Sequence, residues 1–288
     1  MCGILGTNFL SDNFSNALNL LNNRGPDYKS SIKIDNNEFG HTRLAIIDLN
    51  DEANQPMIFD DIVLVFNGEI YNYKELFHVE QLNCKTSSDS EIIIRLYQKY
   101  GFDFLNKLNG MFAFCIYDIK KNLFFCARDR YGKKPFFYYF KDNKFIFSSS
   151  IKSILKILDY KPNLNKVALS KYIQYFVSFG EDTFYQDIFK LEASTYMIYE
   201  PNKAFELQKK KYYRINTYKA IINKTWNEGV KTNKSCLSEY TAGELLEKGL
   251  MNNEKDIAAA KIHYQRAINI CPDKNLYKLL AQGKIDKL

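Results

Sequence analysis

The sequence predicts a mixed α+β protein whose antiparallel sheets are covered on both faces. Strands are indicated by five short segments rich in Phe, Tyr, Ile and Val, namely residues 62–66, 111–118, 123–129, 135–140 and 144–149. These segments are continuously apolar rather than alternating, so both of their faces should be buried. Two further segments, 13–23 and 88–101, have the apolar spacing of helices. Stacked sheets with helices outside fit this pattern, although composition alone does not select them over other α+β layouts.

Turn and cap residues place the ends of these elements. Lys-Lys-Asn at 120–122 and Lys-Asp-Asn at 141–143 each separate two strand segments and predict two hairpins. The helix at 88–101 should open with a capping box formed by Ser88 and Glu91 and should end at Gly101.

Composition and charge exclude several classes of protein. The 288 residues are 46% hydrophobic and 25% charged, as in a soluble globular protein of about two domains. The net charge of +7 comes mostly from scattered lysines, and the run at 209–211 is interpreted as a solvated strand end, because no base-stacking motif accompanies it. No apolar run approaches the roughly 18 residues that span a membrane, and no signal-peptide pattern is present. We therefore expect a cytoplasmic protein without a nucleic-acid or membrane partner.

The six cysteines are far apart in the sequence and form no Cys-x-x-Cys pair. Cys115 and Cys126 lie in strongly apolar segments, where a free cysteine behaves as a small hydrophobe. The spacing therefore favours neither a disulfide framework nor a metal site.

The pattern changes after about residue 213. Residues 214–236 have no sustained period and are interpreted as a linker, whereas residues 237–288 indicate helices. Within this tail, the A-x₃-[FY]-x₂-A-x₄-P spacing of a tetratricopeptide unit is formed by Ala260, Tyr264, Ala267 and Pro272. One unit is too few for a stable solenoid, so we interpret the tail as a helical appendage to a first domain of residues 1–213.

The chain opens with Met-Cys-Gly-Ile-Leu-Gly, which places a thiol directly behind the initiator methionine. Removal of Met1, which is common before a small residue, would leave Cys2 with both a thiol and a free α-amine. Because an α-amine has a pKa of about 7.7–8.0 and a thiol of about 8.5, the amine can take the thiol proton near neutrality. Cys2 would then be a nucleophile with its own general base. The alternative is that Cys2 is a small buried hydrophobe.

Six motifs follow Cys2 in a fixed order. They are NRGPD at 23–27, GHTRLAIIDL at 40–49, FNGEIYNY at 66–73, TSSDSEII at 86–93, LNGMFAFCIYD at 108–118 and ARDRYGKKPFFYY at 127–139. Together they resemble the glutaminase domain of class II glutamine amidotransferases, and most closely that of the glutamine-hydrolysing asparagine synthetases. The resemblance covers residues 1–213.

This resemblance implies the four-layer αββα sandwich of the N-terminal-nucleophile hydrolases. It also implies that Cys2 attacks the side-chain amide of glutamine, releases ammonia and forms a γ-glutamyl thioester that water hydrolyses. The Asn67 side chain and the Gly68 N–H should form the oxyanion hole, and Glu69 should lie beside the substrate. Neither a metal nor a cofactor is expected for this step.

The resemblance also assigns the residues that bind the rest of glutamine. Arg43 should pair with the α-carboxylate and Asp89 with the α-ammonium, and the substrate-binding segment comprises Arg43, Leu44, Ala45, Ile46 and Ile47. Each assignment has a structural alternative: a hairpin turn at Asn67-Gly68, a salt bridge from Arg43 to Asp48, and a helix-capping role for Asp89. The histidines His41, His78 and His263 have no assigned role and are interpreted as ordinary.

The sequence departs from the family in three places. Asn23 stands where the family usually has histidine, and Ser150 stands where glutamate is common. The third departure is the ATP-pyrophosphatase domain, whose Ser-Gly-Gly-x-Asp-Ser loop has no counterpart because no Gly-Gly occurs in the sequence. ATP and Mg are therefore expected only in a synthetase domain that this chain lacks.

Two functions remain open at this point. The first is a glutaminase half that passes ammonia to an amide or amine acceptor such as aspartate, on a separate synthetase or acceptor protein. The second is a truncated or fused asparagine synthetase relic that acts as a non-catalytic interaction protein. The sequence leaves the oligomeric state open, including a homo-oligomer.

Overall fold

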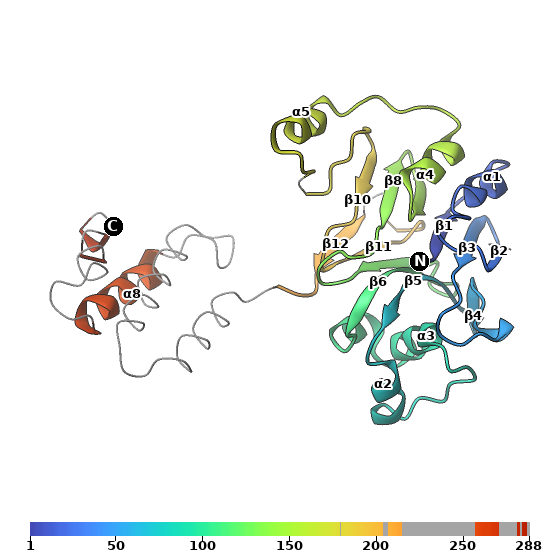
Figure 1. Cartoon of the computed structure of the whole chain (residues 1–288), viewed down its shortest axis with the longest axis horizontal. Coiled ribbons are helices and arrows are strands. Elements are labelled where there is room, and N and C mark those ends of the chain that lie inside the picture. The colour runs from blue at the N-terminus through green and yellow to red at the C-terminus, as the bar shows by residue number, and fades with distance from the viewer. Residues whose placement is uncertain (179, 204–206, 215–256, 271–280, 283, 287–288) are drawn as a thin grey trace. The chain divides into compact units, whose positions relative to one another are not determined.

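A computed structural model of the chain describes residues 1–178, 180–203, 207–214, 257–270, 281–282 and 284–286. The chain forms two compact units, Met1–Arg214 and Ile215–Leu288 (Figure 1). The predicted linker at 214–236 lies outside the described residues except for Arg214, so the domain boundaries stay a prediction.

The first unit contains two six-stranded antiparallel sheets. The first sheet has the strand order β10 (Ile188–Lys190), β8 (Phe137–Lys141), β9 (Lys144–Ser148), β1 (Gly3–Thr7), β3 (Asn37–Arg43) and β2 (Tyr28–Ile34). The second has the order β12 (Gln208–Lys211), β11 (Thr195–Tyr199), β7 (Leu123–Arg128), β6 (Gly110–Asp118), β5 (Ile62–Ile70) and β4 (Met57–Phe59).

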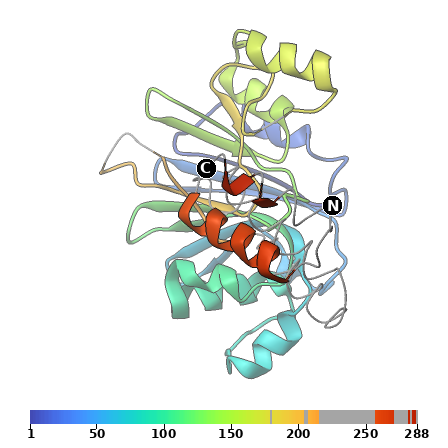
Figure 2. The same cartoon turned by 90° about the vertical axis from the view of Figure 1, so that its left-hand side faces the viewer.

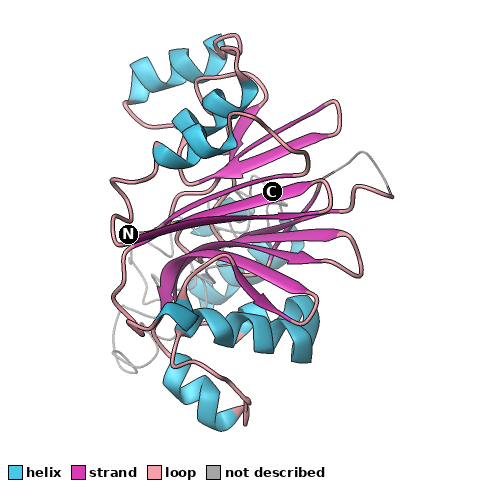
Figure 3. Ribbon diagram, turned by 90° about the vertical axis from the view of Figure 1, so that its right-hand side faces the viewer, coloured by secondary structure: helices cyan, strands magenta, loops and turns pink. Residues whose placement is uncertain are grey.

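Helices cover the outer face of each sheet (Figure 3). The short helix α1 (Phe14–Asn19) and α4 (Ile151–Leu158) pack on the first sheet, while α2 (Tyr73–Val79), α3 (Asp89–Tyr100) and the 3₁₀ turn η2 (Gly101–Asn106) pack on the second. A further 3₁₀ turn, η1 (Asp51–Ala53), lies in the loop after β3, and α5 (Lys166–Tyr175) buries only Ala168. The layers run helix, sheet, sheet, helix, which confirms the αββα sandwich.

The continuously apolar strands are explained by two cores on opposite faces of one sheet. In β6, Phe114 and Ile116 join the core beneath the helices, whereas Cys115 and Tyr117 join the core between the sheets. Alternate side chains of a strand point to opposite faces, so a strand with two buried faces has no polar positions. The prediction of doubly covered sheets is therefore confirmed.

Both predicted hairpins form. β6 and β7 pair from Asp118 and Leu123 outward, and β8 and β9 pair from Lys141 and Lys144 outward. The second turn consists of two residues with φ of +50° and +59°, Asp142 and Asn143. Asp and Asn tolerate this left-handed conformation better than most residues, which explains a tight turn at this position.

The predicted capping box at the start of α3 is wrong in one half. The Ser88 hydroxyl caps the helix by accepting the Ser90 N–H at 3.1 Å. The Glu91 carboxylate instead accepts the N–H groups of Lys85 and Thr86, at 2.9 and 2.7 Å, and so holds the loop before the helix. The predicted helix end is confirmed, since Gly101 follows the last helical residue with φ +55°. The helix predicted at 13–23 is shorter than expected and ends at Asn19.

The strand predicted at 62–66 continues to Ile70, so a hairpin turn at Asn67-Gly68 is wrong. Asn67 and Gly68 pair with Ala113 and Phe112 of β6 inside a regular ladder. A Cβ atom on Gly68 would lie 2.3 Å from the Met111 carbonyl oxygen, so only glycine fits at this position.

Four cysteines lie among the described residues, and all four are free thiols. Cys115 and Cys126 are buried and face each other across β6 and β7. Cys236 and Cys271 lie outside the described residues. The lysines at 209–211 form most of β12, an exposed edge strand, as the sequence predicted. In the described part of the chain, no helix has the length and hydropathy needed to cross a bilayer.

The described part of the second unit is built on α8 (Ile257–Ile270), drawn as one regular helix in Figure 2. Ala260, Tyr264 and Ala267 lie on one face of α8 and are fully buried, together with Ala281. Pro272, the last position of the tetratricopeptide spacing, lies outside the described residues. The apolar spacing of the tail therefore marks a packed helical face.

Candidate active site

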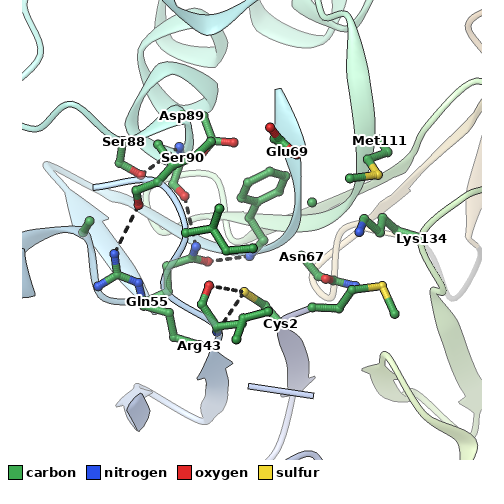
Figure 4. A pocket seen from close by; sticks show the side chains of 17 residues that line it. Cys2, Arg43, Gln55, Asn67, Glu69, Ser88, Asp89, Ser90, Met111 and Lys134 are labelled. Carbon is green, nitrogen blue, oxygen red and sulfur yellow. Dashed lines mark hydrogen bonds between the residues drawn. The ribbon is translucent and has the colours of Figure 1, made fainter. Parts of the chain in front are cut away.

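A cavity of about 230 Å³ opens in the first unit, between the two sheets and the start of α3 (Figure 4). The predicted site residues that line it are Cys2, Arg43, Leu44, Ile46, Ile47, Asn67, Gly68, Glu69 and Asp89. Ala45 does not line it, because this residue turns away and donates its N–H to the Asp27 carboxylate at 2.8 Å. The structure thus brings together side chains from four separate stretches of the sequence.

Cys2 lies at the cavity wall directly before β1. All five residues of β1 are buried, with β3 on one side and β9 on the other, so the chain start is fixed. The Cys2 sulfur accepts the Leu44 N–H at 3.4 Å, and the Cys2 carbonyl accepts from the Arg24 guanidinium at 3.0 Å. Burial raises the pKa of the thiol, and the Leu44 N–H, the N-terminal ammonium and the Arg43 guanidinium counteract part of that rise.

The side chain of Asn67 is buried and unpaired beside Cys2 (Figure 4). Neither its nitrogen nor its oxygen has a hydrogen-bond partner in the part of the chain that the structure describes. A buried amide without partners costs about 1–3 kcal/mol, so native proteins rarely keep one without a reason. A bound ligand would supply the missing partner.

The backbone N–H of Gly68 points into an open edge of β5. Gly68 lies opposite Phe112 of β6. The Phe112 N–H donates to the Asp129 carboxylate, and the Phe112 carbonyl accepts the Asp129 N–H, so Phe112 makes no backbone hydrogen bond with Gly68. The Gly68 N–H therefore points away from β6. On that side β4 does not reach Gly68, because it pairs only with Ile62–Leu64 of β5. The edge therefore presents an N–H that no strand covers.

The two N–H groups on either side of Gly68 along this edge are both occupied. Phe66 donates to the Gln55 side-chain oxygen at 2.6 Å, and Ile70 donates to the Asp89 carboxylate at 2.9 Å. Alternate residues of a strand direct their N–H groups to the same edge, so the Gly68 N–H lies between these two bonds. The Gly68 N–H and the Asn67 amide are thus two hydrogen-bond donors on the cavity wall.

Arg43 ends β3 and its guanidinium is almost fully buried. Its two terminal nitrogens donate to oxygens of one loop, namely the carbonyls of Ile47, Asp48 and Asn50 and the side chain of Asn54. The carboxylate of Asp48 is engaged elsewhere, with the N–H and hydroxyl of Ser87. The alternative of a salt bridge between Arg43 and Asp48 is therefore wrong, and Arg43 contributes an intact positive charge to the cavity.

Asp89 and Glu69 form an acidic side of the cavity. Asp89 is the first residue of α3 and is only 5% exposed. Burial and the nearby charge of Glu69 together raise the pKa of its carboxyl to about 6, against the lowering effect of the Ile70 N–H. A helix-start carboxylate is ordinarily stabilised, but among the described residues no cation pairs with Asp89, and its side chain accepts the Ile70 N–H. A cationic ligand group would supply a counter-charge.

Sequence reasoning missed several lining residues. Gln55 links the two sides of the cavity, because its amide nitrogen donates to the Ser90 hydroxyl at 3.0 Å while its oxygen holds Phe66. Lys134 lines the opposite side with Met111. Lys134 lies inside the motif ARDRYGKKPFFYY, which was the one signal available for it.

Two other residues near the cavity have structural positions. Asn23, the departure from the family histidine, is exposed and does not line the cavity. His41 is fully buried, donates one hydrogen bond from Nε2 to the Phe66 carbonyl, and has its pKa lowered by burial to about 3. It is a neutral core histidine, in agreement with its interpretation as ordinary.

The fold and this cavity define a class of protein. A two-sheet sandwich with a nucleophilic side chain at the start of a central strand is the arrangement of the N-terminal-nucleophile hydrolases. The sequence of residues 1–213 matches the family model that describes the glutamine amidotransferase domain. The chain belongs to the class II glutamine amidotransferase family, and the resemblance seen in the sequence is confirmed.

Curated relatives give a finer position within the family. An asparagine synthetase-type protein of Methanocaldococcus jannaschii is 38% identical over 251 residues, which are 78% of this chain and 48% of the relative. Asparagine synthetase 3 of Bacillus subtilis, named as glutamine-hydrolyzing, is 37% identical over 158 residues, which are 52% of this chain and 26% of the relative. The chain thus spans half or less of the length of these relatives.

A solved structure supports the fold. The glutamine phosphoribosylpyrophosphate amidotransferase of B. subtilis matches with a TM-score of 0.55 and 16% identity, over 93% of this chain and 64% of that chain. The domain is therefore of the asparagine synthetase type in sequence, on a backbone shared with a more distant amidotransferase.

Replacing Asp89 with Asn should stabilise the protein at pH 7.5. Asp89 has a higher pKa in the folded protein, about 6, than the value of about 3.9 expected for the unfolded chain. Its protonated form therefore contributes stability that is fully present below about pH 4 and is lost as the pH rises through 6. Asn imitates the protonated carboxyl at every pH.

Urea unfolding should show Asp89→Asn about 1–3 kcal/mol more stable than the wild type at pH 7.5, with the difference fading towards pH 4. Asp103→Asn, at an exposed position of η2, is the matched control and should change stability by less than about 0.5 kcal/mol. A destabilised Asp89→Asn at pH 7.5 would mean that the carboxylate is paired in solution.

Proposed function

We propose that this chain hydrolyses glutamine to glutamate and ammonia through a thioester on Cys2, with the ammonia destined for an amide or amine acceptor such as aspartate. The observation that carries the proposal is the unpaired, buried amide of Asn67 beside the Cys2 thiol in one cavity. The relatives named as glutamine-hydrolyzing asparagine synthetases support this substrate.

The proposed reaction needs only groups of this chain and water. After removal of Met1, the α-amine of Cys2 takes the thiol proton, and the sulfur attacks the carbon of the substrate amide. The amide oxygen becomes negative and accepts hydrogen bonds from the Asn67 nitrogen and the Gly68 N–H. The carbon–nitrogen bond then breaks, the leaving nitrogen takes the proton held by the amine, and ammonia departs. Water attacks the thioester and releases glutamate.

The remaining polar groups of glutamine find complementary charges in the cavity. The α-ammonium is proposed to bind Asp89, beside Glu69, where a cation would relieve the repulsion between the two carboxylates. The α-carboxylate is proposed to bind Arg43, next to the segment Leu44–Ile47. Because its terminal nitrogens already hold the 47–54 loop, Arg43 offers its charge and its Nε–H.

The second candidate, a non-catalytic relic, is less well supported by this geometry. If the cavity bound no ligand, the buried unpaired amide of Asn67 and the buried unneutralised carboxylate of Asp89 would lower the stability of the protein without serving a function. The ammonia acceptor is proposed to lie on a separate synthetase-type protein, where ATP and Mg would be needed. A homo-oligomer and a cytoplasmic location remain expectations.

Cys2→Ala should abolish glutamine hydrolysis, because the sulfur forms the covalent intermediate. Cys84→Ala is the matched control, since Cys84 is a half-buried free thiol outside the cavity, and its activity should equal that of the wild type. Ammonia release is the measurement, on protein whose N-terminus has been checked by intact mass. Full activity of a chain that retains Met1 would contradict the role of the amine.

Asn67→Ala should lower kcat by about 10²–10³-fold, the usual effect of losing one oxyanion donor. Asn109→Ala, an exposed asparagine outside the cavity, should leave kcat unchanged. Steady-state kinetics with glutamine separate the outcomes: a variant with normal kcat and a raised KM would show that Asn67 binds the ground state rather than the oxyanion.

The chain alone should turn glutamine into glutamate and ammonia without using ATP, since its sequence offers no Gly-Gly phosphate loop. Incubation with glutamine, aspartate, ATP and Mg should therefore yield no AMP and no asparagine by mass spectrometry. Asparagine made by the purified chain would place the acceptor site on this protein.

A further inference from the structure

Lys134 is a buried cation whose backbone is held firmly in the loop between β7 and β8. Its N–H donates to the Asp129 carboxylate at 3.1 Å, and its carbonyl accepts from the Arg128 guanidinium at 2.6 Å. The residue is 5% exposed, and its side chain extends into the cavity beside Asn67 and Met111 (Figure 4). The loop therefore fixes a long, flexible side chain at one place on the cavity wall.

The Lys134 ammonium forms neither a hydrogen bond nor an ion pair with any residue that the structure describes. Burial lowers the pKa of this ammonium, and the attraction of Cys2 is the largest effect that opposes the shift. Arg24 lowers the pKa further, whereas Glu69 and Asp129 raise it. A buried cation without a partner is costly, which argues that Lys134 has a role in the cavity.

Lys134 also acts on the chain's N-terminal amine. Burial is the largest effect that lowers the pKa of that amine, and the charges of Lys134 and Arg24 lower the pKa further. Cys2 and Asp27 oppose the shift and raise the pKa. On the sulfur itself, the Leu44 N–H, the amine and Arg43 favour the anion, while Asp89 opposes it. Lys134 lines the same cavity as Met1 and Cys2, so its charge lies on the wall that holds both the N-terminal amine and the thiol. Removal of Met1 would place the amine on Cys2 itself.

The position of this charge matters for an amine that serves as a base. An α-amine with a pKa of about 8 is only about 10% neutral at pH 7, and one with a pKa of about 7 is half neutral. A nearby cation lowers the pKa of the amine and so increases its neutral fraction, and it also stabilises a negatively charged sulfur. Both effects make the nucleophile available at lower pH.

We propose that Lys134 is a positioning residue for the nucleophile, whose buried ammonium favours a neutral N-terminal amine and a negatively charged Cys2 sulfur. This inference rests on the proposed role of Cys2. Lys134 keeps its own proton throughout and forms no bond with the substrate. Its effect is a fixed charge, held by the Asp129 and Arg128 contacts to its backbone.

The test measures the reactivity of Cys2 without using glutamine. Protein with Met1 removed is treated with iodoacetamide between pH 5 and pH 9, and the alkylation rate at Cys2 is followed by peptide mass spectrometry. In Lys134→Met the pH midpoint of alkylation should rise by about one unit, at the low end of the range for an adjacent charge. Lys134→Arg, which keeps the charge, should stay near the wild type.

Lys133→Met is the matched control, because Lys133 is the exposed neighbour in the same loop and does not line the cavity. Its midpoint should equal that of the wild type. Lys134→Gln provides a second neutral side chain with a polar end, and thermal unfolding checks that each variant is folded. Folded Lys134→Met and Lys134→Gln proteins with the wild-type midpoint would overturn the inference.

A parallel glutaminase assay separates this inference from the proposed function. If the wild type hydrolyses glutamine but the midpoint does not depend on Lys134, the inference is wrong and the proposed function stands. If the midpoint rises in Lys134→Met but no glutamine is hydrolysed, the charge effect stands and the proposed substrate is wrong.

Discussion

The open edge of β5 is the constraint on which the candidate site depends. β4 pairs with β5 only from Ile62 to Leu64, so β5 continues beyond Leu64 without a neighbouring strand on that side, although it remains inside the protein. Uncovered strand edges are usually avoided because their N–H and C=O groups are unpaired. Here Gln55 takes the Phe66 N–H and Asp89 takes the Ile70 N–H, and the N–H between them is left for a ligand. The shortness of β4 therefore creates the donor site.

The stacking of the two sheets sets where the thiol lies relative to these donors. Cys2 precedes β1 of the first sheet, whereas Asn67 and Gly68 belong to β5 of the second. Between the sheets lies a core that includes Ile4 and Val65, which are neighbours in sequence of the site residues and are fully buried. Interiors pack densely and relax little, so this core holds the Cys2 thiol and the two donors at a fixed separation. The site geometry is a consequence of sheet packing.

The sequence predicted the layers of this fold because continuously apolar strands have one physical explanation, burial on two faces. It did not predict that β5 runs through Asn67, Gly68 and Glu69, because polar residues in a strand look like its end unless the cavity they face is known. Glu91 was misassigned for a related reason, since the loop N–H groups that it accepts compete with the helix start. Gln55 joins the site through its contacts with Phe66 and Ser90, which are distant in sequence, and Lys134 reaches the cavity through the packing of the sheets; local patterns encode neither. The order of family motifs supplied the remaining site residues, and only Ala45 turned away from the cavity.

The cavity carries several energetic costs that a single kind of ligand would relieve. In the described part of the chain, Asp89 is a buried carboxylate that accepts the Ile70 N–H but pairs with no cation, and Asn67 is a buried amide without partners. Arg43 adds a positive charge on the wall of the same cavity, so a ligand of one charge would satisfy Asp89 or Arg43 and be repelled by the other. A zwitterion with an amide at its far end would satisfy the charges and the amide together, and free glutamine has this chemistry. Because a ligand that binds only the folded state stabilises it, a ligand of this kind would offset part of the cost of burying these groups.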